Sequence, residues 1–177
     1  MERSLLAAIA EHEAAEDLLL VPCDFDLSGD DHVEEVVLAS GARLDPFAGT
    51  GCGGTYFFCG EPAADDPFGE RRPVLYADSE GSAAVLALGG LAELLELLLG
   101  HPEWRDGGTE LVELSEEMRE DHPDYEAERD EVARLLGLAI PAPEQLLDRL
   151  RRSLAATEPD HLLLNAVEGN AYGLLRF

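Results

Sequence analysis

The chain has 177 residues, and its 38 aspartates and glutamates against 12 basic residues give a formal net charge of -26 at pH 7. All 12 basic residues are arginines, which excludes chemistry that needs a lysine, such as Schiff-base formation or the lysine of a phosphate-binding loop. The acidity also argues against a nucleic-acid partner, because phosphate contacts require a cationic surface. The length and the 46% hydrophobic content are those of one folded domain with a core.

The first 20 residues contain apolar stretches, but four acids between positions 11 and 17 interrupt them. They therefore predict neither a signal peptide nor a membrane-spanning helix. The three cysteines are an odd number and lack CxxC spacing, which favours a reducing compartment and argues against a structural zinc site. We expect a cytoplasmic protein that binds no membrane.

Hydrophobic periodicity predicts the elements of the first hundred residues. In chain order they are a helix over 4–16, a strand over 17–25, a short helix within 30–44, a strand over 54–60, strands over 72–78 and 82–88, and a helix over 89–100. The strands are rich in aromatic and β-branched residues and are bounded by glycines, whereas the last helix is rich in leucine.

The remaining chain is mostly helical in pattern. Residues 109–137 predict an acidic helical part that breaks at Pro123, because proline cannot sit in a helix interior. Residues 143–156 predict an amphipathic helix with Pro143 at its start. The last segment, 161–177, predicts two strands around the turn sequence VEGN. Without regular βαβ alternation, the whole predicts an α+β fold with a mixed, largely antiparallel sheet flanked by helices.

The stretch GTGCGG at 49–54 matches the GxGxxG spacing of dinucleotide-binding loops. Such a loop must follow a strand and open a helix, so that the helix N-terminus meets the pyrophosphate. Here the glycines precede the strand TYFFC, so we expect a turn entering a strand and no nucleotide site.

A second pattern, DFDLSGDDHVEE at 24–35, places oxygen donors and a glycine at the spacing of an EF-hand calcium loop. A calcium-binding protein is therefore our alternative hypothesis. The other interpretation is an acidic loop that caps the next helix. The candidate ligands are Asp24, Asp26, Ser28, Asp30 and Glu35.

Two further groups of acids have open interpretations. Asp78 and Glu80 could form a catalytic or metal-binding pair or simply a turn, and we favour the turn, since paired catalytic carboxylates need differently tuned environments. The segment 110–131 holds 11 acids, which are either a solvated face or a docking surface for a basic protein.

The chain contains no HExxH or GxSxG motif, which are signatures of metalloproteases and serine hydrolases. A cysteine nucleophile, Cys52 or Cys59, is left as an open alternative.

The order of motifs over residues 49–99 resembles the SUKH superfamily, which includes bacterial immunity proteins and fungal cell-wall regulators. In that family a glycine-rich stretch enters an aromatic strand, a second strand ends in an acidic turn closed by EG, and a leucine-rich helix follows. The matching positions are Gly51, Gly53, Tyr56, Pro73, Val74, Tyr76, Asp78, Glu80 and Gly81.

The resemblance implies a single domain over 1–177, with a family-like core at 41–100, an acidic helical part at 108–158 and a terminal hairpin at 161–177. It also implies a non-catalytic protein-binding module without cofactor, whose bacterial relatives block a co-encoded toxin, often a nuclease. An acidic antidote suits a basic toxin, because it mimics the polyanionic substrate and associates quickly. The residues expected to bind the partner are Tyr76, Asp78, Glu80, Glu113, Glu116, Glu117 and Glu120.

Overall fold

The structure, a computed structural model, describes residues 3–177 and contains a five-stranded sheet in the order β2-β3-β4-β5-β7. Its strands are β2 (Leu44–Gly49), β3 (Thr55–Cys59), β4 (Val74–Ala77), β5 (Ser82–Ala87) and β7 (Gly173–Leu174). Neighbours pair antiparallel except β5 and β7, which are parallel. A second, two-stranded antiparallel sheet joins β1 (Val36–Leu38) to β6 (Leu163–Asn165).

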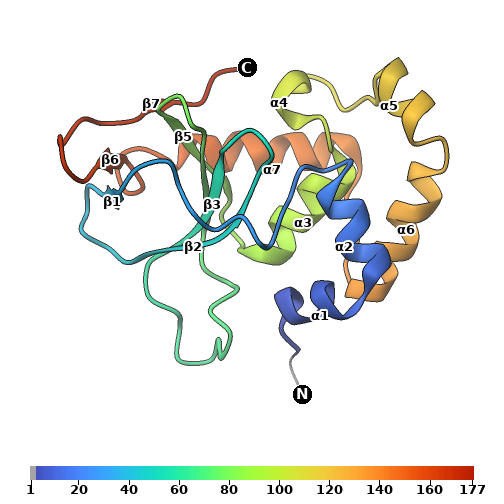
Figure 1. Cartoon of the computed structure of the whole chain (residues 1–177), viewed down its shortest axis with the longest axis horizontal. Helices are drawn as coiled ribbons and strands as arrows, with labels where there is room; N and C mark the ends of the chain where they lie inside the picture. The colour runs from blue at the N-terminus through green and yellow to red at the C-terminus, as the bar shows by residue number, and fades with distance from the viewer. Residues whose placement is uncertain (1–2) are drawn as a thin grey trace.

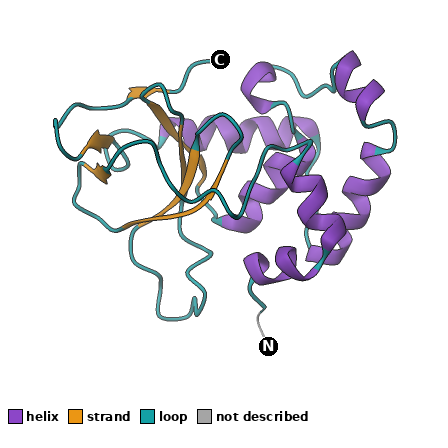
Figure 2. Cartoon of the chain, viewed as in Figure 1, coloured by secondary structure: helices purple, strands orange, loops and turns teal. Residues whose placement is uncertain are grey.

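Helices gather on one side of the five-stranded sheet (Figure 2). Next to the sheet lie α3 and α7, which both contact β5, and beyond them α2 packs on α6 (Figure 1). This arrangement confirms the predicted α+β fold with a mixed, largely antiparallel sheet flanked by helices. The helices are α1 (Leu5–Glu11), α2 (Glu13–Leu20), α3 (Leu91–Gly100), α4 (Trp104–Gly107), α5 (Glu116–Asp121), α6 (Tyr125–Leu136) and α7 (Pro143–Ala155).

Every residue of β3 and β4 is buried, because both faces of the sheet are covered. Alternate side chains, such as Tyr56 and Tyr76, belong to the large core shared with the helices. The intervening Phe57 and Leu75 enter a smaller core on the opposite face, which the β1–β6 sheet and Tyr172 cover. The two-residue alternation of a strand thus divides the aromatic residues of this region between two cores.

Two predictions for the first 44 residues are wrong. Segment 17–25 is not a strand, since α2 continues to Leu20 and buries Leu18 and Leu19 against the core. Segment 30–44 contains no helix; Val36–Leu38 forms β1, whose partner β6 lies more than 120 residues away. A pairing of that range leaves no signal in a local hydrophobic pattern. The helix predicted over 4–16 is interrupted at His12, whose extended backbone separates α1 from α2.

The later predictions are closer to the structure. The break at Pro123 separates α5 from α6, and α7 begins at Pro143, as predicted. Residues 111–115 are not helical. The terminal hairpin forms locally through a bridge between Leu164 and Ala171, but the chain then leaves it, and β7 pairs with β5 in the larger sheet. Within residues 3–177, no helix combines the length and apolar character needed to cross a membrane.

Candidate functional site

The glycine-rich loop at 50–54 connects β2 to β3 as a tight turn. Thr50 accepts backbone hydrogen bonds at its carbonyl from Gly53 and at its hydroxyl from Gly54. Gly54 must lack a side chain, because a Cβ there would overlap the Tyr76 hydroxyl. The loop is therefore a turn packed over a tyrosine, as expected, and does not open a helix.

The turn at 78–81 joins β4 to β5 and is held by Asp78. Its Oδ1 atom accepts hydrogen bonds from the backbone N–H groups of Glu80 (2.9 Å) and Ser82 (2.8 Å), while Gly81 adopts a φ of 95°. The Ser79 hydroxyl donates to the Cys52 carbonyl at 3.1 Å and ties this turn to the glycine-rich loop. Asp78 is thus engaged by the turn and Glu80 is exposed, which favours the turn over a catalytic pair.

Arg105 of α4 lies beneath these two loops. Its guanidinium stacks over the rings of Tyr76 (5.0 Å) and Trp104 (4.9 Å), and its Nη1 donates to Asp24 at 3.1 Å. Its Nε and Nη2 atoms are buried and have no hydrogen-bond partner among residues 3–177, so its charge is stabilised by the aromatic rings and by Asp24. Burial raises the pKa of Tyr76, and the nearby Arg105 opposes that rise.

A cleft of about 290 Å³ opens over Arg105, between the two loops and the C-terminal residues 175–177. Three of the predicted binding residues, Tyr76, Asp78 and Glu80, line this cleft, so the structure brings them together. Tyr76 is only 1% exposed and forms the floor of the cleft, so its predicted role as a direct contact does not fit its burial. Arg105 was missed from the sequence, because its place under the cleft depends on packing between distant segments.

The candidate calcium ligands at 24–35 are not brought together. Asp24 accepts a hydrogen bond from Gly51 N (2.7 Å) and pairs with Arg105, while Asp26 accepts from the backbone and hydroxyl of Ser28. Asp30 and Glu35 are exposed. No group of three or more His, Cys, Asp or Glu side chains within residues 3–177 is placed to hold a metal ion. The structure therefore gives the calcium-loop hypothesis no support, and Asp24 and Asp26 instead organise the loop through their hydrogen bonds.

The acids of segment 110–131 lie on and beside α5 and α6, whose inner faces bury Met118, Tyr125 and Val132. Three of the acids pair with arginines: Glu113 with Arg119, Asp130 with Arg129, and Glu131 with Arg134. The others are exposed and have no ion-pair partner among residues 3–177; we call them the acidic helical face. Its members are Glu110, Glu116, Glu117, Glu120, Asp121, Asp124, Glu126 and Glu128.

The structure thus places the predicted Glu116, Glu117 and Glu120 together on α5, away from the cleft at Arg105. The Ser115 hydroxyl accepts from Met118 N at 3.1 Å as the α5 N-cap and donates to Glu103 at 2.6 Å. This bond anchors α5 to α4 and fixes the direction in which its acids point. The predicted binding residues therefore form two separate surfaces rather than one.

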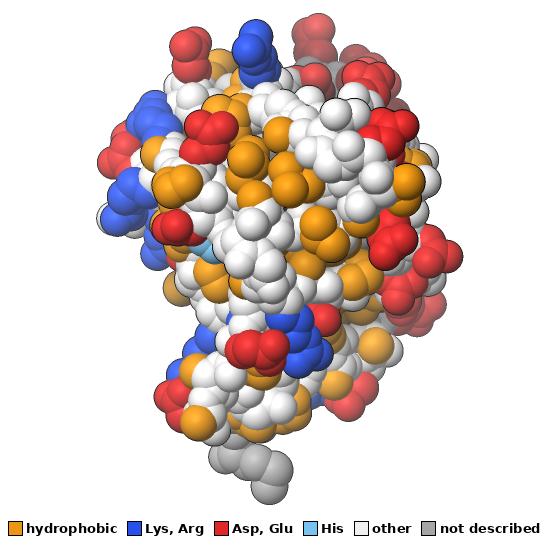
Figure 3. All heavy atoms as spheres, turned by 90° about the vertical axis from the view of Figure 1, so that its left-hand side faces the viewer, with side chains coloured by type: hydrophobic (Ala, Val, Ile, Leu, Met, Phe, Trp, Pro, Cys, Tyr) orange, Lys and Arg blue, Asp and Glu red, His pale blue; other side chains and the backbone are white. Residues whose placement is uncertain are grey.

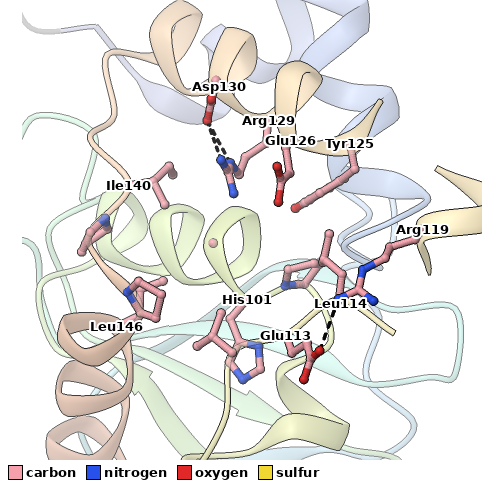
Figure 4. A pocket seen from close by; sticks show the side chains of 15 residues that line it. His101, Glu113, Leu114, Arg119, Tyr125, Glu126, Arg129, Asp130, Ile140 and Leu146 are labelled. Carbon is pink, nitrogen blue, oxygen red and sulfur yellow. Dashed lines mark hydrogen bonds and ion pairs between the residues drawn. The ribbon is translucent and has the colours of Figure 1, made fainter. Parts of the chain in front are cut away.

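Between the end of α3, α6 and the loops at 112–114 and 140–143 lies a cavity of about 440 Å³ (Figure 4). Arg119 and Arg129 approach it from two sides, each paired with an acid, and Glu126 points into it (Figure 4). His101 is buried, forms a hydrogen bond with the Gly108 carbonyl (3.1 Å), and has a lowered pKa because of burial. The Arg119 and Arg129 charges are each balanced by a neighbouring acid, and Glu126 adds a carboxylate without an ion-pair partner among residues 3–177, so the cavity lining does not favour an anionic ligand.

A polar chain on the opposite face of the sheet had no signal in the sequence. His32 forms hydrogen bonds with the Thr55 hydroxyl (3.0 Å) and the Tyr172 hydroxyl (3.1 Å), and the Tyr172 hydroxyl donates to Glu34. Burial lowers the pKa of His32, with Glu34 opposing the shift. Thr55 is fully buried, so the chain fastens the loop before β1 to the sheet and presents no accessible nucleophile.

The cysteines differ in accessibility. Burial raises the pKa of the thiols of Cys23 and Cys59 to about 12, which makes both unreactive at neutral pH. Cys52 is exposed at the glycine-rich loop, with Thr50 Oγ1 3.3 Å from its sulfur. Of the two candidate nucleophiles, Cys59 is therefore unsuited to the role.

Figure 3 looks onto the end of the molecule where β1, β6 and β7 lie, and shows hydrophobic side chains at its centre with charged groups around them. Exposed hydrophobic residues of these segments include Val37, Val167 and Leu174. They are spread over separate strands and a hairpin tip, and this surface lacks the concentration of acids seen along α5 and α6.

Comparison of the chain with family models, with curated proteins and with solved structures finds no match.

Proposed function

We propose that the protein is a non-catalytic binding domain for a basic protein partner, and that this partner is a toxin encoded beside it. The observation that carries the proposal is the acidic helical face. Its carboxylates are exposed and make no ion pair among residues 3–177, and the only contribution to the fold evident from their positions is the small helix-dipole effect of those in the first turns of α5 and α6. They are free to attract a cationic surface, which speeds association over distances of about a Debye length.

The resemblance to the SUKH superfamily supports the same proposal. The residues that carry it lie in one connected unit, in which the glycine-rich loop, β3, β4, the 78–81 turn, β5 and α3 follow each other in sequence and in space. The positions of Gly53 and Asp78 have structural roles in this unit, as a positive-φ turn and as the acceptor that closes the next turn. Immunity proteins of that superfamily act by binding, not by catalysis.

The test is a binding and neutralisation assay with the toxin domain encoded next to this chain. We expect a 1:1 complex and stoichiometric loss of toxin activity, with an association rate that falls steeply between 20 and 300 mM NaCl. Absence of binding at micromolar concentration and 20 mM NaCl would overturn the proposal. Neutralisation at far below one equivalent would show turnover and would overturn its non-catalytic part.

A matched pair of variants locates the interaction. The first removes three charges from α5 by Glu116→Gln, Glu117→Gln and Glu120→Gln, and should slow association about tenfold. The second removes the same number of charges from exposed sites elsewhere, by Asp31→Asn, Glu35→Gln and Asp160→Asn. An equal effect of both variants would show that net charge, and not the acidic helical face, drives binding.

A further inference from the structure

A groove of about 530 Å³ runs between α2 and α6, where α2 meets the far end of the acidic segment 110–131. Its lining residues Ala14, Asp17 and Leu18 of α2, together with the C-cap residue Val21, fall on one face of the helix, because positions 14, 17/18 and 21 follow its turns. Its other wall is α6, which packs against α2. The groove is thus bounded by two helices and spans about 10 Å along α2, or two helical turns.

The floor of the groove is apolar. Leu18 and Val132 are buried where α2 meets α6, and Pro22 is half-buried beyond the end of α2. Val21, however, is 65% exposed. Together with the exposed Ala14 and the half-buried Pro22, Val21 forms an apolar surface within the groove that an apolar side chain of a partner can contact.

The rim of the groove is acidic on both sides. Asp17 on α2 and Glu128 on α6 are exposed and have no ion-pair partner among residues 3–177. Glu131, one turn further along α6, lies 3.6 Å from Arg134 and is only partly neutralised. None of the described residues that line the groove is an arginine. An apolar floor between two acidic rims is complementary to a helix with an apolar stripe between basic flanks.

We propose that this groove docks a cationic amphipathic helix of the partner protein. The inference rests on the proposed function, since it assumes a basic protein partner, and adds which part of that partner is recognised. A second copy of this chain is a poor occupant, because a net charge of -26 opposes self-association. An anionic membrane surface is repelled by the same rim.

The test uses an 18-residue fluorescent peptide with leucines at every third or fourth position and lysines and arginines on both flanks. A scrambled peptide of the same composition keeps the charge but loses the apolar stripe. We expect the striped peptide to bind the full chain at least tenfold more tightly at 50 mM NaCl, measured by fluorescence anisotropy. Equal binding of the two peptides would overturn the inference, because charge alone would then explain it.

Variants of the chain then show whether the striped peptide binds in the groove. Val21→Ser should weaken the striped peptide about fivefold or more and leave the scrambled peptide unchanged, whereas Leu111→Ser, at another exposed hydrophobic residue, should affect neither. The pair Asp17→Asn and Glu128→Gln should weaken the striped peptide more than Glu116→Gln and Glu117→Gln on α5. Both serine substitutions are at exposed positions, and unchanged unfolding in urea confirms that the fold is kept.

Three outcomes would contradict the proposal that this groove docks a helix of the partner. They are equal effects of Val21→Ser and Leu111→Ser, a dimer in sedimentation experiments that Val21→Ser abolishes, and preferential binding of the groove to anionic vesicles. Failure of this inference is distinguishable from failure of the proposed function. If the toxin domain binds wild type and Val21→Ser equally well, the proposal that the groove docks the partner is wrong, and the proposed function stands. If the toxin domain does not bind wild type, the proposed function fails.

Discussion

Acidic residues have opposite roles in two regions of this molecule. In the loop before β4, Glu70 is 8% exposed and its carboxylate accepts hydrogen bonds from the Ser4 hydroxyl (2.6 Å) and from the N–H groups of Leu5 (2.7 Å) and Leu6 (3.1 Å). It thereby caps the N-terminus of α1 from 65 residues away. On α5 and α6, the acids of the acidic helical face are exposed and make no ion pair among residues 3–177.

The difference separates acids that accept hydrogen bonds within the fold from exposed acids that accept none, which we propose serve a partner. Asp66 and Asp78 resemble Glu70, because each accepts hydrogen bonds from two backbone N–H groups of its own loop. Backbone donors near the interior must find acceptors, so these carboxylates are required by the loops. The acidic helical face meets no such requirement, and its removal should leave the fold intact.

The largest effect is expected for Glu70→Ala. This substitution leaves the donors of Ser4, Leu5 and Leu6 without their acceptor, and hydrogen bonds to a charged group contribute about 1.5–3 kcal/mol each without being additive. We expect a loss of about 3 kcal/mol in the free energy of unfolding, measured by urea denaturation at pH 7. Glu120→Ala on α5 should change it by less than about 0.5 kcal/mol. Similar losses at Glu70 and Glu120 would contradict the distinction between acids that hold the fold and acids that do not.

A smaller loss is expected for Asp78→Ala. The turn at 78–81 would lose two side-chain-to-backbone hydrogen bonds, at a cost of about 1–2 kcal/mol. Glu80→Ala, two residues away in the same turn, is the matched control and should be nearly neutral, since Glu80 is exposed. A larger loss for Glu80→Ala would show that the wrong acid has been assigned to the turn.

Acid should destabilise the protein through the buried His101 and the half-buried His32. Burial lowers the pKa values of His32 and His101 below the 6.5 of an unfolded chain, so below pH 6.5 the unfolded state binds more protons than the folded state. The free energy of unfolding should therefore fall as the pH decreases from 7.5 towards 5, as urea titrations at fixed pH will measure. In His32→Asn the free energy of unfolding should fall less over the same pH range. An unchanged pH dependence in that variant would show that His32 does not contribute to it.

The smallest effect on stability is expected on the acidic helical face. Glu117→Gln with Glu120→Gln removes two exposed charges from a strongly acidic chain, and should change the free energy of unfolding by less than about 0.5 kcal/mol. Differential scanning calorimetry at 20 and 300 mM NaCl measures both the change and its screening by salt. A destabilisation above about 1 kcal/mol would mean that these acids serve the fold after all.

Local sequence patterns predict the parts of this fold whose neighbours lie nearby along the chain. β3, β4, β5 and α3 follow one another and bury their faces against each other, so alternation in the strands and leucine spacing in the helix are sufficient to identify them. β1 pairs with β6 across more than 120 residues, and β7 adds only two residues to β5; neither leaves a local signal.

For the candidate sites too, the sequence predicts local features and misses those that depend on distant segments. The 78–81 turn and the helical character of the acidic segment on either side of Pro123 follow from turn chemistry and spacing. The burial of Tyr76, the guanidinium of Arg105 beneath it, and the acidic groove between α2 and α6 arise from tertiary packing of distant segments. The spacing at 24–35 likewise gave no sign that Asp24 is engaged by Gly51 and Arg105.

The most direct test of the central claim measures stability and association in the same variant, Glu116→Gln with Glu117→Gln and Glu120→Gln. The claim is that the acidic helical face serves a partner and not the fold. We predict a free energy of unfolding within about 0.5 kcal/mol of wild type and an association rate with the proposed toxin partner about tenfold slower at 20 mM NaCl. A destabilised variant that associates at the wild-type rate would contradict the claim.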